Sequence, residues 1–366
     1  MINTRSWPVR RLNLCLPLAL GLLLSACGDS APPAAQHPAS TTAQTAASHY
    51  SPEIQALYHQ ALDAGDKEVV LYTAFPDTID LWAAFNRDFP GITLRPSMAD
   101  QIYTRLASEQ SSGNHIGDVV LTGYSELSEL VRQQRLQKDT PASSAGLPAQ
   151  YLDPAGYFQL PWVNAFTVGY NTQRLKAQEV PDTWAEILDP QRKNTFAHVR
   201  FYGASPFDAA VILLQEENKL SDADLHTLHD NAQVADNPGS LISNLAQGRT
   251  SFVLWAPAQG LARMRDSGAP IGLAFPKDVA ILYGPGVALI RQAPHPAAAA
   301  LFKNWLFSPQ AQAIIAEREY AYGTVPGSPA PKGFPDIGTF QQKFIPYDQV
   351  NAYFDRYRQK TAAIWK

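Results

Sequence analysis

From residue 50 onward, short runs of apolar residues alternate with segments whose apolar residues recur at helical spacing. Residues 68–74 form the first such run, which is typical of a buried strand, and residues 77–89 place four large apolar side chains on one helical face. Further strands are predicted at residues 92–94, 118–121, 166–171, 196–200, 251–255 and 284–290. Because strands that alternate with helices form parallel sheets covered on both faces, the pattern predicts an α/β protein.

The extreme N-terminus has a different pattern, that of an export signal. Three arginines precede the apolar stretch 12–24, whose length of about 13 residues is below the roughly 20 that a membrane-spanning helix needs. The stretch ends in Leu24-Ser25-Ala26-Cys27, which resembles the lipobox of bacterial lipoproteins. We therefore predict a signal peptide at residues 1–26 and a lipid anchor on Cys27. The alternative is an ordinary signal peptide with a coincidental cysteine.

Residues 27–49 are mostly Ala, Pro, Ser, Thr and Gln, and they contain no large apolar side chain. Such a segment cannot bury a core, so it is predicted to be a flexible tether. The only cysteines are Cys15, within the signal, and Cys27. The body of the protein is therefore expected to fold without disulfides, as suits an exported chain held by lipid.

Composition narrows the function classes. Of the 366 residues, 45% are hydrophobic and 17% charged, which excludes a disordered or fibrous protein. The 29 Lys and Arg against 33 Asp and Glu give a formal charge of −4. Because phosphate neutralisation needs clustered basic residues, an acidic chain without basic blocks argues against a nucleic-acid partner.

Several segments in a fixed order connect the body to a known family. They are residues 68–73, 85–92, 104–109, 117–120, 168–171, 181–190 and 302–326, the last of which contains Ser308-Pro309-Gln310-Ala311-Gln312. Together they resemble the extracellular solute-binding lipoproteins of bacterial ABC importers, in the branch of ferric-ion, phosphonate and sugar-phosphate receptors. The resemblance implies a periplasmic-binding-protein type II fold, with two α/β lobes, a two-stranded hinge and a ligand cleft.

The resemblance also implies a domain layout and partners. Lobe one is expected to comprise residues 50–155 plus 286–366, and lobe two residues 156–285, with crossings near 155–165 and 280–287. The expected function is capture of a small solute, by lobe closure, for an inner-membrane ABC permease. The protein is expected to act in the periplasm as a lipid-anchored monomer that needs no cofactor.

The chain departs from the ferric-ion receptors of this branch at three positions. Where those receptors usually carry a Tyr-Tyr pair after a strand, this sequence reads Trp255-Ala256-Pro257. Their frequent His and Glu positions correspond to Thr73-Ala74-Phe75 and Thr122-Gly123-Tyr124. Fe(III) needs several anionic oxygens that converge, and these positions do not provide them. A ferric-ion receptor is therefore the alternative, and a receptor for an organic anion is the main prediction.

Strand ends define the candidate ligand site, because ligands of open α/β sheets bind beyond the carboxyl ends of the strands. Ser97, Ser125 and Ser205 each precede a predicted helix, whose N-terminal N–H groups favour an anion, and Arg200 adds a positive charge. The residues predicted to bind ligand are Thr73, Ser97, Thr122, Tyr124, Arg200, Ser205, Trp255 and Tyr283. The preferred ligand is a phosphonate, phosphate ester or carboxylate. Each residue also has a structural interpretation: helix cap, surface ion pair, or core or hinge aromatic.

The sequence gives little support for a metal site or for catalysis. His226 and His229 have the spacing of a metal-binding pair, but Leu225 and Leu228, expected to face inward, favour a solvated histidine face. Motifs of hydrolases, zinc proteases and nucleotide-binding loops do not occur, so no enzymatic activity is expected. A periplasmic enzyme with a two-domain cleft and a signalling receptor remain the alternatives from other functional classes.

Overall fold

The computed structural model describes residues 47–75, 78–98, 101–200, 206–276, 279–340, 343–344 and 349–364. The lipobox with Cys27, most of the tether, and Ser205 lie outside the described residues. All described residues fall within one unit of the chain, Ala39–Lys366.

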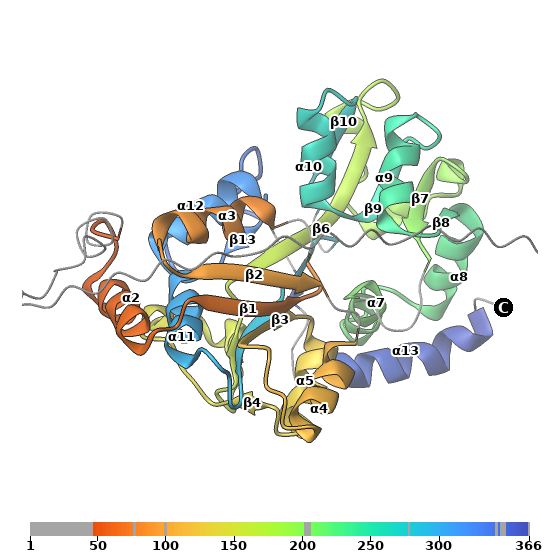
Figure 1. Ribbon diagram of the computed structural model, residues 1–366. Helices are drawn as coiled ribbons and strands as arrows, with labels where there is room; N and C mark the ends of the chain where they lie inside the picture. The colour runs from red at the N-terminus through yellow and green to blue at the C-terminus, as the bar shows by residue number, and fades with distance from the viewer. Residues whose placement is uncertain are drawn as a thin grey trace, which may run out of the picture. The chain divides into compact units, whose positions relative to one another are not determined.

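The first sheet is built as the strand–helix alternation predicts. Its strands lie in the order β2-β1-β3-β12-β4, with β5 also paired to β12. Figure 1 labels β1 to β4 of this sheet. The strands are β1 (Glu68–Thr73), β2 (Thr93–Met98), β3 (Val119–Thr122), β4 (Leu136–Gln137), β5 (Phe158–Gln159) and β12 (Gly286–Ile290). The first three are mutually parallel, whereas β12 runs antiparallel to β3.

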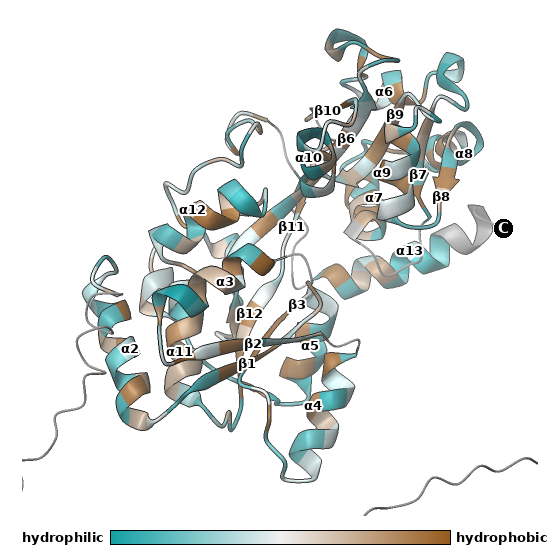
Figure 2. Ribbon diagram, turned by 45° about the horizontal axis from the view of Figure 1, so that its top comes forward, coloured by the Kyte–Doolittle hydropathy of each residue, from teal (hydrophilic) through white to brown (hydrophobic). Residues whose placement is uncertain are grey.

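The helices associated with this sheet contribute buried side chains to its core. They are α2 (Pro52–Ala64), α3 (Ile79–Asp88), α4 (Ile102–Ser111), α5 (Tyr124–Arg132), α11 (Pro296–Trp305) and α12 (Pro309–Arg318). Figure 2 shows hydrophilic and hydrophobic turns along α2 and α12, as expected for helices with one buried face. Phe85 of α3 packs edge-on against Phe302 and Trp305 of α11, which joins elements far apart in the sequence.

The second sheet has the strand order β14-β11-β6-β9-β7-β8, and β10 and β13 also pair with β6. Its strands are β6 (Trp162–Asn171), β7 (Phe196–Val199), β8 (Gln233–Ala235), β9 (Phe252–Pro257), β10 (Ile271–Ala274), β11 (Ile281–Tyr283), β13 (Tyr322–Gly323) and β14 (Lys343–Phe344). The helices of this region are α6 (Trp184–Ile187), α7 (Pro206–Glu216), α8 (Asp222–Asn231), α9 (Pro238–Ala246), α10 (Ala258–Asp266) and α13 (Val350–Ile364). Short 3-10 turns lie at Ala142–Ser144, Ala149–Tyr151, Ala177–Glu179 and Pro190–Arg192.

Within the described residues, the chain passes between the two sheets at three places, the last of them after α12, where β13 and β14 join the second sheet. It leaves the first sheet after β5 and enters the second with β6, then returns between β11 and β12. At this crossing β11 and β6 are antiparallel partners, with Tyr283 opposite Asn164. A Cβ atom on Gly284 would lie 2.1 Å from the Trp162 carbonyl oxygen, so only glycine allows the two crossing segments to approach this closely.

The C-terminal segment differs from the predicted layout, which assigned residues 286–366 to lobe one. Strand β14 pairs with β11 of the second sheet, and α13 packs on α7 and also contacts α5 (Figure 1). The physical reason lies in the side chains of α13, since Val350, Tyr353, Phe354 and Tyr357 are buried in the core cluster that contains α7. The remaining lobe boundaries stay a prediction.

Candidate functional site

Residues from the elements around both sheets line a cavity of about 70 Å³, which we call the interlobe cavity. It lies among the loop between β1 and α3, the crossing strand β6, helix α10 and the residue that follows α12. Its lining residues are Phe75, Thr78, Trp162, Asn164, Gln259, Arg263 and Glu319. The volume corresponds to one or two water molecules or a small polar group.

An ion pair connects the two lobes at this cavity. Arg263 of α10 donates from Nη2 to Glu319 Oε2 over 2.8 Å. The Glu319 side chain is only 5% exposed, whereas that of Arg263 is 35% exposed. The other carboxylate oxygen, Glu319 Oε1, has no hydrogen-bond partner among the residues that the structure describes.

The environment of Glu319 changes its acidity. Burial raises the pKa of Glu319 to about 7, because a desolvated carboxylate prefers its neutral form. The Arg263 guanidinium and the backbone N–H of Leu81, in the first turn of α3, favour the ionised form, while the Asp80 carboxylate disfavours it. Glu319 therefore exchanges a proton near neutral pH.

A second set of polar contacts lies beside the cavity. Asp266, at the end of α10, accepts a 2.6 Å hydrogen bond from the Tyr320 hydroxyl and one of 3.2 Å from Lys332 Nζ. These bonds, together with the neighbouring Arg265, lower the pKa of Asp266 to about 2. Helix α10 is thus tied to the segment after α12 at two successive turns.

Three of the predicted ligand residues lie at the ends of first-sheet strands and already hold local partners. Thr73 Oγ1 accepts a 3.0 Å hydrogen bond from the Phe75 backbone N–H. Thr122 Oγ1 donates to Glu126 Oε2 over 2.8 Å, and Ser97 Oγ accepts from Arg105 over 3.0 Å. Their ligand-binding roles stay predictions.

The predicted helix caps at Ser97 and Ser125 are wrong. Ser97 lies within β2, which continues to Met98, and α4 begins later, behind Gln101 at a left-handed φ of 57°. Ser125 lies inside α5, which begins behind Gly123 without a side-chain cap. In both cases the chain starts the helix at a different position from the one that the hydroxyl pattern indicates.

The predicted aromatic residues pack against protein. The rings of Tyr124 and Tyr283 are 5.0 Å apart in an edge-on arrangement, and the Tyr124 backbone N–H donates to the Tyr283 hydroxyl over 3.3 Å. Burial raises the pKa of Tyr283 to about 12. Trp255 is 1% exposed and donates from Nε1 to the Val279 carbonyl over 3.1 Å.

Arg200 and His226 lie toward solvent, whereas His229 is half-buried. Arg200 is 56% exposed and is 3.4 Å from Asp236, a geometry typical of a weak surface ion pair. On α8, Leu225 and Leu228 are buried and His226 is exposed, as the sequence predicts, but the predicted solvated position is wrong for His229, whose Nδ1 atom is buried. Across the described parts of the chain, no three His, Cys, Asp or Glu side chains converge as a metal site would require.

Two α/β sheets, with one cavity lined by residues from elements of both, give the two-lobed architecture that solute-binding proteins have. The chain belongs to the family of bacterial extracellular solute-binding proteins, whose model matches residues 80–341. This confirms the fold class and the family that the sequence predicts. Within the described residues, no helix is both long enough and apolar enough to span a bilayer.

Three of the similar proteins are named for iron uptake or for iron binding, or were solved with iron. The chain is 24% identical over 308 residues to iron uptake protein A1 of Synechocystis sp., covering 78% of this chain and 83% of the relative. Apo ferric ion-binding protein A of Pasteurella haemolytica superposes with a TM-score of 0.68 at 18% identity, over 82% of this chain and 98% of that one. FutA (IdiA) of Trichodesmium, solved with iron and citrate ligands, superposes with a TM-score of 0.66 at 18% identity. The match covers 82% of this chain and 100% of that one.

Proposed function

We propose that this protein is the receptor of an ABC importer and that its cargo is ferric iron bound to an anionic organic chelator. The observation that carries the proposal is the similarity to an iron uptake protein over most of both chains. This reverses the order preferred from the sequence, in which an iron-free anion came first.

The need for a chelator follows from the small number of oxygen ligands that this chain offers. The resemblance to ferric-ion receptors implies a tyrosine pair where this chain has Trp255 and Ala256, both of which are buried. Around the interlobe cavity, the charged groups are one carboxylate and one guanidinium. Iron(III) prefers several anionic oxygens, which a chelator would bring itself, and one carboxylate of that chelator, a group of the size of this cavity, suits Arg263.

Capture and delivery follow from the two-lobed fold. A ligand that contacts both lobes only when they are closed shifts the population toward the closed state, which the permease then receives. We further infer that a lipid on Cys27 holds the receptor at a membrane facing the periplasm and that the predicted tether allows it to reach the permease.

A second candidate is an importer of an iron-free anion such as a carboxylate, phosphate ester or phosphonate. The observation that favours it is Arg263, because a guanidinium binds carboxylate and phosphate oxygens with or without a metal. Arg200 and Ser205 stay candidate contacts for either ligand.

Native mass spectrometry of the purified full chain, followed by titration calorimetry, tests the two candidates. We expect a bound mass that contains iron, and binding of ferric citrate that is at least about tenfold tighter than that of citrate alone. Equal affinities, or an iron-free organic mass, would favour the second candidate. Turnover of the bound molecule would instead support an enzyme.

A further inference from the structure

The carboxylate of Glu319 lies where a bound anion would be expected. Helix α3 has ten residues, and its N-cap residue, Thr78, makes no cap hydrogen bond, since its hydroxyl donates to the Phe75 carbonyl instead. The Leu81 backbone N–H of the first turn favours the ionised form of Glu319 and so lowers its pKa. Arg263 binds the same carboxylate from the other lobe. A helix N-terminus and a guanidinium that converge on one point form an anion site, and here the chain's own side chain occupies it.

Glu319 fills this anion site only in part, whereas in an ordinary structural ion pair both carboxylate oxygens have partners. Glu319 is nine-tenths buried or more, and the Leu81 backbone N–H lies close enough to favour its anion, yet Oε1 makes no hydrogen bond of normal geometry among the described residues, and the interlobe cavity adjoins it. A buried carboxylate oxygen without a donor is destabilised relative to one in water. Gln259 lines the same cavity and can present either its oxygen or its NH₂ group to it.

We propose that Arg263 and the N-terminus of α3 form an anion-binding site shared by both lobes, and that Glu319 is an internal competitor for it. A carboxylate or phosphate group of the ligand takes the place of the Glu319 carboxylate on Arg263. The proposal rests on the proposed function for its ligand class, and it adds the residues that bind the ligand's charge and the residue that opposes binding.

Because the ligand and Glu319 compete for Arg263, ligand binding is coupled to protonation of Glu319. The charged groups that face Glu319 are Arg263 from α10 and Asp80 from α3. Once the ligand holds Arg263, Glu319 loses its counterion and takes up a proton, which its raised pKa of about 7 makes easy. Below pH 7 the neutral Glu319 competes little, and above pH 7 its anion competes strongly. Anion affinity should therefore fall as the pH rises.

Calorimetric titration of the full chain with sulfate and with citrate, at pH 6 and at pH 8, tests the proposal. Sulfate keeps its charge over this range, so its affinity reports on the protein alone. The variants are Glu319→Gln, which keeps the shape and removes the charge, and Arg263→Gln. Arg265→Gln is the matched control, because Arg265 is on the same helix but pairs with Asp266 outside the cavity lining.

At pH 8 we expect Glu319→Gln to bind sulfate about tenfold more tightly than wild type, and at pH 6 about equally, because the neutral fraction of Glu319 changes about tenfold per pH unit above its pKa. Arg263→Gln should lose sulfate binding at both pH values, and Arg265→Gln should match wild type. Equal affinities of wild type and Glu319→Gln at pH 8, or no sulfate or citrate binding by either, overturn the proposal. If Arg263→Gln still binds ferric citrate like wild type, the receptor function stands and this site is excluded.

Discussion

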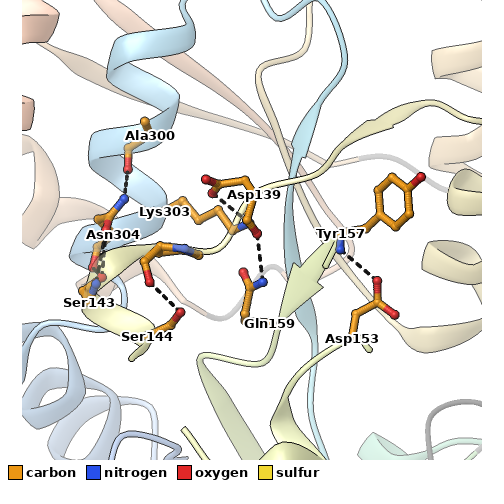
Figure 3. Close-up of polar contacts among 10 residues, drawn as sticks. Asp139, Ser143, Ser144, Asp153, Tyr157, Gln159, Ala300, Lys303 and Asn304 are labelled. Carbon is orange, nitrogen blue, oxygen red and sulfur yellow. Dashed lines mark hydrogen bonds and ion pairs between the residues drawn. The ribbon is translucent and has the colours of Figure 1, made fainter. Parts of the chain in front are cut away.

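Lys303 and Asp139 form an ion pair inside the first lobe, with 3.2 Å between Nζ and Oδ2 (Figure 3). The Lys303 side chain, on α11, has no exposed surface, whereas Asp139 is partly exposed. Gln159 donates from Nε2 to the Asp139 backbone carbonyl over 3.0 Å, which fixes the segment that carries the carboxylate. Burial lowers the pKa of Lys303 to about 8, and Asp139 limits the shift by favouring the ammonium.

The pair predicts a stability that rises with pH in alkaline solution. Between pH 8 and pH 10.5, folded Lys303 has released its proton while the unfolded chain retains it, so the unfolded state binds more protons. Relative to Lys303→Met, the wild type should therefore gain up to about 3 kcal/mol over this range. Urea unfolding of both proteins at pH 7.5 and pH 10 measures the difference.

The partner variant separates charge from packing. Asp139→Asn leaves a buried ammonium without its counterion and should lower the free energy of unfolding by about 2–3 kcal/mol at pH 7. Lys303→Met should be close to wild type there, since it removes a costly buried charge at similar volume. A Lys303→Met protein that is less stable than Asp139→Asn would show that the pair is net stabilising.

Much of the fold follows from the sequence because its signals are local. The apolar run of β1 and the helical spacing of α3 predict both elements, and Ser51, which precedes Pro52, caps α2 as such residues do. Ser97 fails as a cap because the same residue type suits an exposed strand position, and a long-range partner, here Arg105, decides the outcome.

The site is less predictable because its key pair is not local. Arg263 and Glu319 are 56 residues apart, on elements of different lobes. In the sequence, Glu319 belongs to Glu317-Arg318-Glu319, a pattern typical of a solvated helix end. Only the fold shows that its side chain is buried. Phe75 and Thr78, in the loop that follows the strand end of β1, line the interlobe cavity, so the strand-end loops stay the predicted ligand region.

Trp255 predicts a stability effect without a binding effect. It lies at an irregularity where β9 pairs with β6, with a left-handed φ of 50°, and its ring is 5.3 Å from that of Trp184. Trp255→Ala should cost about 3–5 kcal/mol of stability, and Trp255→Phe about 1–2 kcal/mol, because the Val279 carbonyl loses its donor. Denaturant unfolding and ferric citrate titration of each variant provide the measurement. A tenfold loss of affinity in Trp255→Phe, at unchanged stability, would restore the ligand-contact interpretation.

The lipobox predicts the behaviour of one substitution at Cys27. Cys27→Ser removes the thiol that accepts the lipid, so the protein should either appear soluble in the periplasm or retain its signal. Membrane fractionation and the mass of the purified chain distinguish these forms from the anchored one. Ser25→Thr, in the same motif, serves as a control that keeps the thiol. A Cys27→Ser protein that is still processed and still membrane-bound would contradict lipid anchoring at this residue.

The last prediction concerns Tyr283 and iron. A phenol binds iron(III) as its anion, and burial raises the pKa of Tyr283 to about 12, so ionising it at pH 7 costs about 7 kcal/mol. Its oxygen also accepts the Tyr124 backbone N–H, which a bound metal would disturb. We therefore expect ferric citrate to bind without an intense tyrosinate-to-iron absorption band, and Tyr283→Phe to bind it as wild type does. Tyr103→Phe, on the exposed side of α4, is the matched control. A visible band that disappears in Tyr283→Phe and persists in Tyr103→Phe would show that the protein itself supplies a tyrosinate ligand, and the chelator would then not be needed to explain the iron donors.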